Sequence, residues 1–129
     1  MIIDKAFLDQ LTAQAQASPR KRMHYDLRDD MTDTSMRMLN ALEPGTVIPI
    51  HRHTNTSEDV VVLRGEVEEV FFDENGNETE RYHLTAGGDA VACRVPIGQY
   101  HTCRSLRSGS VIIEFKRGMY DPDKTEDLL

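Results

Sequence analysis

The first part of the chain has the apolar period of a helix. The apolar residues that recur at every fourth position are Ile3, Phe7, Leu11 and Ala15. This spacing predicts an amphipathic helix whose apolar stripe packs on the rest of the domain. Asp4 precedes the stripe as a candidate N-cap, and Pro19 is expected to end the helix because the residue before a proline avoids the α region. We therefore expect one helix within residues 1–19.

From residue 35 onward the pattern changes to short runs rich in β-branched and aromatic residues. The runs that predict strands are 36–42, 46–51, 59–64, 66–72, 79–84, 90–95, 101–106 and 110–117. Turn signals separate them: residues 43–46 fit a type II turn, and Asn75-Gly76 is typical of a hairpin. About eight short strands with frequent turns favour an all-β sandwich or barrel.

Residues 20–33 show no regular period. Three basic residues at positions 20–22 are followed by four aspartates. We predict a solvated loop that crosses the domain. The alternative is that the basic residues line a pocket for an anionic substrate.

These patterns predict a single domain over residues 1–129, with the helix in 1–19, the strands of the sandwich or β-barrel in 35–117 and a C-terminal tail in 118–129. Strand alternation alone selects a set of candidate interior residues. They are Val47, Val60, Val62, Val67, Phe71, Val91, Val95, Val111, Ile113 and Phe115. The acidic cluster Glu66, Glu68 and Glu69 is interpreted as a solvated strand face.

Charge and composition exclude several classes of function. Lys and Arg total 15 against 22 Asp and Glu, so the formal net charge is −7, which disfavours nucleic-acid binding. No apolar run approaches the roughly 20 residues that a membrane-spanning helix needs. The N-terminal residues lack the features of a signal peptide, so we expect a cytoplasmic protein without membrane or nucleic-acid partners.

Three of the five histidines lie in two segments flanked by turns. His51 and His53 are two positions apart, so on a strand their imidazoles point to the same side. Glu58 follows after a polar four-residue excursion that is long enough to bring its carboxylate back. His101 belongs to a distant segment and joins this group only if the sheet folds over on itself, as in a barrel.

The two segments resemble the two motifs of the cupin superfamily. The first motif, G-x5-H-x-H-x4-E-x6-G, matches at every fixed position, from Gly45 through the histidines and the glutamate to Gly65. The second, G-x5-P-x-G-x2-H-x3-N, matches at Pro96, Gly98 and His101 and departs from the pattern at Ala90 and Ser105. The resemblance implies a cupin double-stranded β-helix, a jelly-roll barrel, after the N-terminal helix. It also implies that the metal ligands are His51, His53, Glu58 and His101.

A closer resemblance covers nearly the whole chain. The segments that resemble WbuC-type cupin fold metalloproteins are 18–20, 37–46, 51–53, 114–116, Gly118 and 120–122. Members of that family are small bacterial cupins that are often encoded among O-antigen and other surface-polysaccharide genes. The resemblance implies a homodimer, since cupins commonly pair through sheet edges.

Three imidazoles and a carboxylate suit one divalent transition metal ion, either Fe, Mn, Ni, Zn or Cu. Four protein ligands leave a position open for a small-molecule ligand. We hypothesise a metal-dependent enzyme, an isomerase, epimerase or oxygenase, that acts on a small sugar-derived or anionic metabolite in surface-polysaccharide biosynthesis. The alternatives are a non-catalytic binding module and a metal that only stabilises the barrel. The candidate substrate contacts are Arg20, Arg22, Arg52, Arg94 and Tyr100; the catalytic residues are not identified.

Cys93 and Cys103 face one another if the strands around 96–100 form a hairpin. Cys103 is two residues from His101 and therefore shares its side of the strand, so its thiol is expected in the barrel interior. Two small buried apolar side chains are the simpler interpretation, and a thiol near the metal is the alternative.

Overall fold

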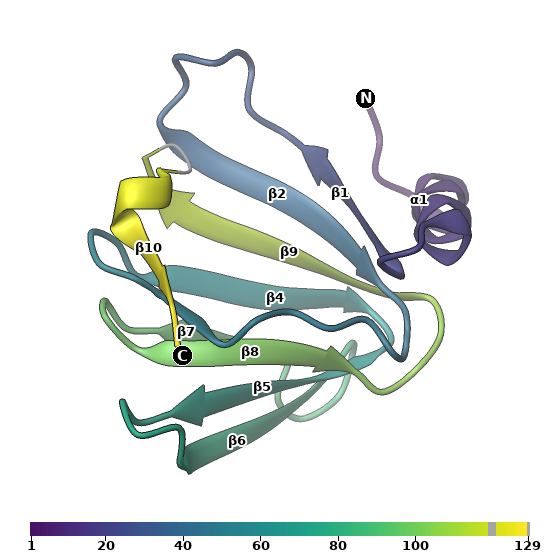
Figure 1. The fold of residues 1–129 in the computed structure, drawn as a ribbon. Helices are drawn as coiled ribbons and strands as arrows, with labels where there is room; N and C mark the ends of the chain where they lie inside the picture. Colours follow the sequence, from purple (N-terminus) through teal and green to yellow (C-terminus); the bar gives the residue numbers. More distant parts are fainter. Residues whose placement is uncertain (119–120, 129) are drawn as a thin grey trace.

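Two five-stranded antiparallel sheets face each other, and one helix lies outside them (Figure 1). The computed structural model describes residues 1–118 and 121–128, so Tyr120 of the resembling tail is outside the described residues. The elements in chain order are α1 (Lys5–Ala17), β1 (Arg22–Asp26), β2 (Ser35–Leu42), β3 (His51–His53), β4 (Glu58–Arg64), β5 (Glu66–Phe72), β6 (Glu78–Thr85), β7 (Ala92–Val95), β8 (Tyr100–Ser105), β9 (Ser110–Arg117), the 3₁₀ turn η1 (Pro122–Lys124) and β10 (Thr125–Asp127).

The chain passes repeatedly from one sheet to the other. One sheet has the order β1-β2-β9-β4-β7, and the other has the order β10-β3-β8-β5-β6. Consecutive strands β2, β3, β4 and β5 therefore alternate between the sheets, and their alternate side chains point into the space between them. The predicted all-β jelly-roll class with an N-terminal helix is confirmed.

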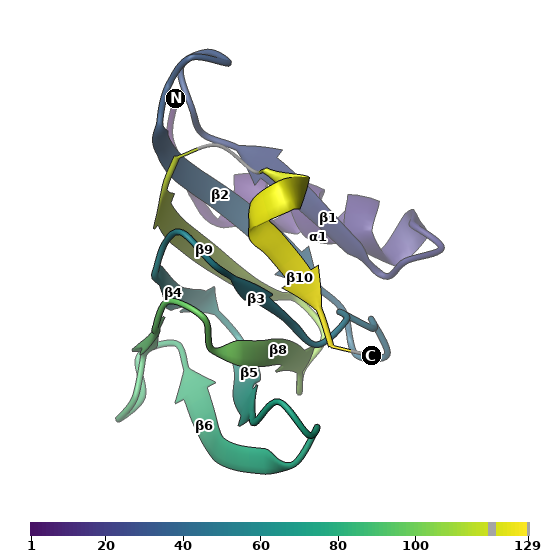
Figure 2. The same ribbon diagram turned by 60° about the vertical axis from the view of Figure 1, so that its left-hand side comes forward.

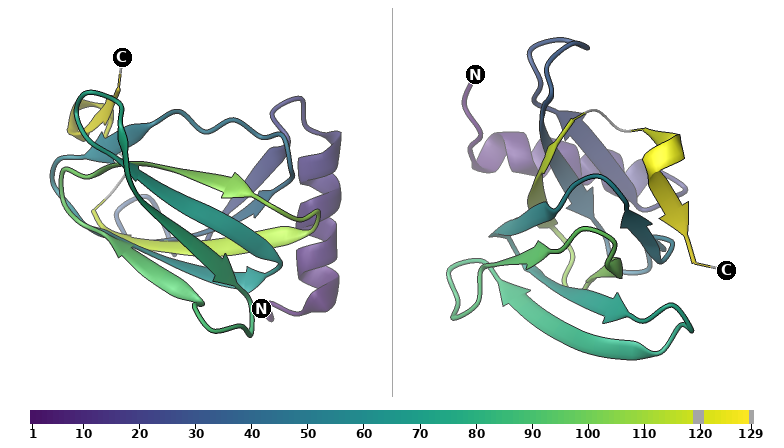
Figure 3. Two further views of the ribbon diagram at one scale, coloured as in Figure 1. Left: turned by 90° about the horizontal axis from the view of Figure 1, so that it is seen from below. Right: turned by 90° about the vertical axis from the view of Figure 1, so that its left-hand side faces the viewer.

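The helix forms where its apolar period predicts. The Asp4 carboxylate accepts a hydrogen bond from the Phe7 amide at 3.0 Å, and Ser18 is already extended before Pro19. The buried side chains of α1 pack on the outer face of the β1-β2-β9-β4-β7 sheet. Figure 3 (left) shows this sheet beside the helix. The residues of this outer core are Leu8, Leu11, Ala15, Leu39, Ala41 and Val111.

The segment 20–33, predicted as a loop, contains a strand, so that prediction is wrong in part. β1 pairs with β2 over its whole length, from Arg22 opposite Leu42 to Asp26 opposite Met38. Met23 packs against the outer core beneath the helix. The many charged residues of this segment gave no sequence pattern that would predict the contact of Met23 with the core. The sheet region therefore begins at residue 22 rather than 35.

Residues 46–50, predicted as the start of a strand, form no strand, and β3 is only three residues long. Pro49 has no amide hydrogen to donate to a neighbouring strand. The preceding turn is confirmed, because Gly45 has a φ of +94° and the Thr46 amide bonds the Glu43 carbonyl at 3.1 Å.

The tail adds a strand to the sheet that carries the histidines. β10 pairs with β3, with Thr125 opposite His53, and Figure 2 shows the two strands side by side. The Thr54 amide donates to the Lys124 carbonyl and the Leu128 amide to the Ile50 carbonyl, both at 2.8 Å. Residues 118–129 are thus more than a tail, since their strand forms one edge of the second sheet.

An apolar core fills part of the space between the sheets. Its buried residues are Leu42, Val60, Val62, Val67, Phe71, Leu84, Val95, Cys103 and Ile112. The predicted interior positions Val47, Val91 and Phe115 are instead exposed, at 78%, 41% and 38% of their surface. Within the described residues, no helix is long and apolar enough to cross a membrane.

Gly65 marks the corner at which β4 of one sheet leads into β5 of the other. Its φ is +82°, and an added Cβ would lie 2.7 Å from the Ser110 Cα and closer still to its hydroxyl oxygen. The Ser110 hydroxyl in turn bonds the amide and carbonyl of Glu66 at 3.1 Å. This corner lies so close to Ser110, the first residue of β9, that only glycine fits at position 65.

We expect Gly65→Ala to lower the free energy of unfolding by about 3 kcal/mol, the sum of left-handed strain and overpacking. Gly45→Ala is the matched control, because Gly45 also has positive φ but nothing lies within 4 Å of an added Cβ. That control should cost about 1 kcal/mol. Urea denaturation of both variants measures the difference, and equal losses would contradict the close approach.

Candidate metal centre

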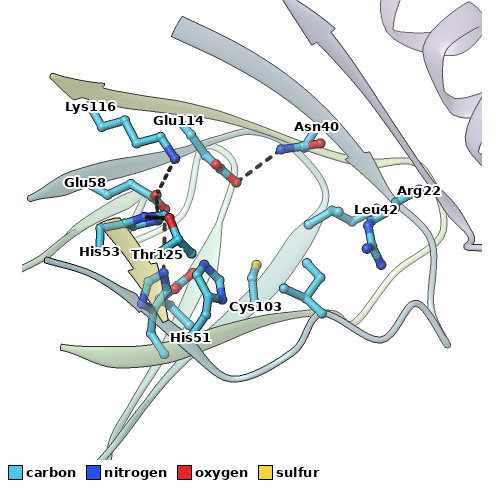
Figure 4. A pocket seen from close by; sticks show the side chains of 13 residues that line it. Arg22, Asn40, Leu42, His51, His53, Glu58, Cys103, Glu114, Lys116 and Thr125 are labelled. Carbon is cyan, nitrogen blue, oxygen red and sulfur yellow. Dashed lines mark hydrogen bonds and ion pairs between the residues drawn. The ribbon is translucent and has the colours of Figure 1, made fainter. Parts of the chain in front are cut away.

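A cavity of about 300 Å³ lies between the two sheets, beside the apolar core. Figure 4 shows its lining: the histidines of β3 stand near Glu58 and Lys116 at one side, while Arg22 and Leu42 lie at the other. The cavity therefore has a nitrogen- and carboxylate-rich side and a more apolar side.

Three imidazoles converge in this cavity. His51, His53 and His101 each offer a ring nitrogen, and these atoms lie within 4.8 Å of one another. His51 is directly opposite His101 in the antiparallel pairing of β3 with β8. The sheet therefore brings His101, from a distant part of the chain, next to His51 and His53, as the metal site predicted from the sequence requires.

Each imidazole is held in place through its Nδ1 atom. His51 Nδ1 bonds the Pro49 carbonyl at 2.8 Å, and His101 Nδ1 bonds the Gln99 carbonyl at 3.0 Å. A carbonyl only accepts, so in both rings Nδ1 carries the hydrogen and Nε2 keeps its lone pair. His53 Nδ1 lies 3.2 Å from the Thr125 hydroxyl of β10.

Glu58 completes the polar side. Its Oε2 is 3.2 Å from His53 Nε2, and its Oε1 is 3.8 Å from His101 Nε2. Lys116 Nζ lies 4.0 Å from Oε2. Burial alone would raise the pKa of Glu58, but the His53 hydrogen bond and the neighbouring basic groups outweigh it and lower the pKa below its ordinary value.

Burial keeps two of the imidazoles neutral. It lowers the pKa of His51 and lowers that of His101 to about 4, against a smaller opposing effect of the Glu58 charge on each. A neutral imidazole and an ionised carboxylate are the forms that bind metal ions.

The donor set fits a divalent transition metal. Ligand atoms about 2.1 Å from one ion and at right angles to each other are about 3 Å apart, close to the His53–Glu58 separation. The three nitrogen donors are mutually close, and His51, His53 and His101 have anchored rings. These residues suit the ion that the cupin resemblance implies.

Of the candidate substrate contacts, Arg22 alone lines the cavity. It donates to the Val47 carbonyl at 2.8 Å. Arg52 lies on the opposite side of β3 from the histidines, where its guanidinium is 4.7 Å from the Tyr100 ring centre and 2.6 Å from Glu126.

The other two arginines lie away from the cavity lining. Arg94 is exposed and pairs with Asp59 at 2.8 Å. Arg20 is exposed, and its carbonyl accepts a hydrogen bond from Thr46. The structure thus brings one of the five candidates to the cavity.

Two further carboxyl groups line the cavity and were not selected from the sequence. Glu69, interpreted as part of a solvated face, is 1% exposed, so that interpretation is wrong for this residue. Strand alternation could have predicted its burial, because Glu69 lies between the interior positions Val67 and Phe71 on the same side of β5. Glu114 lines the cavity from β9 and accepts a hydrogen bond from Asn40 at 3.2 Å.

Burial raises the pKa of both groups, and the Glu58 charge adds to the effect. The pKa of Glu69 lies well above its ordinary value, and that of Glu114 rises to about 8. Glu114 therefore holds a proton at neutral pH, and burial favours the neutral form of Glu69 in the same way.

The cysteines do not face one another across a hairpin, so that expectation is wrong. β7 pairs with β4, whereas β8 pairs with β3 and β5 in the other sheet. Both cysteines are free; Cys103 is buried in the apolar core between the sheets, and Cys93 is partly buried and packs against that core. Cys103 also lines the cavity, as its position two residues from His101 predicted.

Residues 3–84 match the family model described as a domain of unknown function, DUF6016. The chain belongs to this family. The part of this DUF6016 chain that the model covers includes His51, His53 and Glu58, whereas His101 lies beyond it. No curated protein matches the chain.

Solved structures similar to this DUF6016 chain are cupin β-barrels. A capsular polysaccharide assembling protein, CapF from Staphylococcus aureus, has a TM-score of 0.72 and 22% identity over 86% of this chain and 32% of its own length. An oxalate oxidase in complex with the substrate analogue glycolate has a TM-score of 0.65 and 16% identity over 87% of this chain and 57% of its own. KdgF from a Halomonas species has a TM-score of 0.61 and 19% identity over 81% and 85%. The chain spans about a third of CapF, and these similarities establish the fold.

We expect both thiols to be unreactive in the native protein. Burial raises the pKa of Cys93 to about 12 and that of Cys103 well above its ordinary value, so neither forms the reactive thiolate at pH 8. Titration with a chromogenic disulfide reagent should detect almost no thiol in native protein and two per chain after denaturation. Rapid labelling of one native thiol would contradict the buried placement.

Proposed function

We propose that this chain is a small metal-dependent enzyme that binds a sugar-derived or anionic metabolite through the metal ion in its cavity. The observation that carries the proposal is the convergence of three anchored imidazoles and Glu58 on one side of a cavity that has room beyond them. A bound divalent ion would act there as a Lewis acid toward ligand oxygens. Arg22, at the far side, offers a positive charge to an anionic ligand group.

The same proposal extends to the biological setting. The WbuC-type resemblance and the similarity to a capsular polysaccharide assembling protein support a role in bacterial surface-polysaccharide biosynthesis. We also propose a cytoplasmic homodimer that pairs through sheet edges, as cupins commonly do. Light scattering tests the dimer.

A non-catalytic binding module is the second candidate. The similarity to CapF supports this candidate, because the chain spans only about a third of that protein. The shared cupin domain is thus one part of CapF, and a part of a larger protein can serve to bind a ligand. The buried Glu114 carboxyl in the cavity favours the enzyme, because a pKa raised to about 8 suits proton transfer near neutral pH.

We expect the protein as isolated to contain close to one divalent transition metal ion per chain and a His51→Ala/His53→Ala variant to contain almost none. Removal of two of four ligands leaves too few donors for tight binding. Elemental analysis measures both. The matched control is His24→Ala/His83→Ala, which removes two exposed histidines. Absence of metal from the wild type, with none taken up on addition, would refute the metal site.

The same proteins separate the candidate functions. An enzyme should convert a compound in a panel of sugars and sugar acids, followed by NMR, only when metal is bound. A binding module should bind without conversion. A merely structural ion should change the melting temperature alone.

Thr125→Val should weaken metal binding about tenfold or more, because the hydroxyl that orients the His53 ring is lost while the side-chain shape is kept. Competition with a chromogenic chelator measures the affinity. Glu126→Gln is the control on the same strand, since it alters only the Arg52 contact. Equal affinities of both variants and wild type would contradict the role of Thr125.

A further inference from the structure

Glu69 differs from the other two carboxyl groups at the cavity, because neither of its oxygens has a nitrogen or oxygen partner within hydrogen-bond distance. It is 1% exposed, and neither of its carboxyl oxygens has a nitrogen or oxygen partner among the described residues. The Cys103 thiol, opposite Glu69 on β8, is a weak donor beside it and does not satisfy both oxygens. The other carboxyls are satisfied: Glu58 contacts His53 and Lys116, and Glu114 bonds Asn40.

An unpartnered buried carboxyl is costly and calls for a physical reason. Transfer of such a group from water without a hydrogen bond costs several kcal/mol, at least about 1–3 by protein mutational measures. Nearly all buried polar side chains in native proteins have a partner, and the exceptions point to a bound water, ion or ligand. Because Glu69 lines the cavity, its partner must enter through the cavity.

The surroundings of Glu69 select the chemistry of that partner. A cationic ligand group would be repelled by Lys116 and by a divalent ion held at the histidines. An anionic group would be repelled by the charge of Glu58 and by any charge on Glu69. An uncharged hydroxyl both donates and accepts, so it can satisfy the carboxyl in either protonation state. Burial also raises the pKa of this carboxyl and so favours its protonated form, which donates as well as accepts.

We propose that Glu69 is the hydroxyl-recognition residue of the metal cavity, and that the ligand is a polyhydroxylated compound with one hydroxyl at Glu69 and other oxygens toward the metal position. The inference rests on the proposed function, since it names the ligand class of the same site. In this role Glu69 selects the ligand by a hydrogen bond and takes no part in the making or breaking of covalent bonds.

A series of α-hydroxy acids tests this assignment. Lactate, glycerate and erythronate share one chelating carboxylate and α-hydroxyl and carry zero, one and two further hydroxyls. Calorimetric titration of the Zn²⁺-loaded protein should give affinities for glycerate or erythronate about tenfold above that for lactate, the gain of one buried hydrogen bond.

Two variants remove the carboxyl in different ways. Glu69→Met keeps most of the volume and cannot bond a hydroxyl, and Glu69→Ala adds no bulk and serves if the first fails to fold. Either should bind lactate as the wild type does and lose the preference for extra hydroxyls to within about twofold. Glu68→Met is the matched control, because Glu68 is the neighbouring residue on β5 and points outward to Arg81. It should leave the preference intact.

Thermal stability gives an independent readout. Loss of a buried, unpartnered carboxyl should raise the melting temperature of Glu69→Met in the absence of ligand, as is common where binding groups are removed from sites. A structural role for Glu69 would lower it. A lower melting temperature together with an unchanged hydroxyl preference overturns the proposal.

The remaining outcomes separate this inference from the proposed function. If the wild type binds all three acids with equal affinity, hydroxyl recognition by Glu69 is refuted. A water molecule is then the partner of Glu69, and the metal cavity remains a binding site. Binding of none of them to the Zn²⁺-loaded protein refutes the proposed function and the inference together.

Discussion

Burial of ionisable side chains between the two sheets is the constraint on which the rest of the structure depends. In a barrel of 129 residues, every second side chain of each strand points inward, and several of these positions hold histidine or glutamate rather than an apolar residue. Each such group costs free energy unless it is neutral, hydrogen-bonded or bound to an ion. The three Nδ1 bonds of the imidazoles and the contact between Glu58 and Lys116 reduce that cost, whereas Glu69 has no nitrogen or oxygen partner among the described residues and only the weak Cys103 thiol donor beside it.

Apolar packing elsewhere offsets this cost. The interior core that includes Leu42 and Ile112 occupies the part of the barrel beside the cavity. A second core lies outside the barrel, where the helix covers Leu39 and Val111 of the first sheet. Strand β2 illustrates the division, because Leu39 and Ala41 face the helix while Asn40 and Leu42 line the cavity. The helix thus stabilises the sheet from the side opposite the cavity.

Features that depend on neighbouring residues could be predicted from the sequence, whereas distant strand pairings could be predicted only where the cupin motifs indicated them. The Asp4 cap, the turn at Gly45 and the hairpin at Asn75 follow from local propensity, and the structure has each of them. The cupin spacing grouped His51, His53, Glu58 and His101, and these side chains lie together. Strand β1, by contrast, forms through its pairing with β2 and its packing under the helix. Its own sequence is rich in charged residues and does not predict a strand. The placement of the cysteines depends on which strands pair, and no local pattern contains that information.

The short strand that carries two of the candidate ligands owes much of its order to the last strand of the chain. β3 pairs with β8 at one position, His51 with His101, but pairs with β10 at three. Further main-chain bonds from Thr54 and Leu128 extend that pairing on both sides, and the Thr125 hydroxyl reaches His53 itself. Because a ligand favours the state that binds it, an ion at the histidines would stabilise the docked β10, and the docked β10 would in turn favour the ion. An ion at the histidines and the docked C-terminal strand would therefore stabilise each other, although some 70 residues separate His53 from Thr125 along the chain.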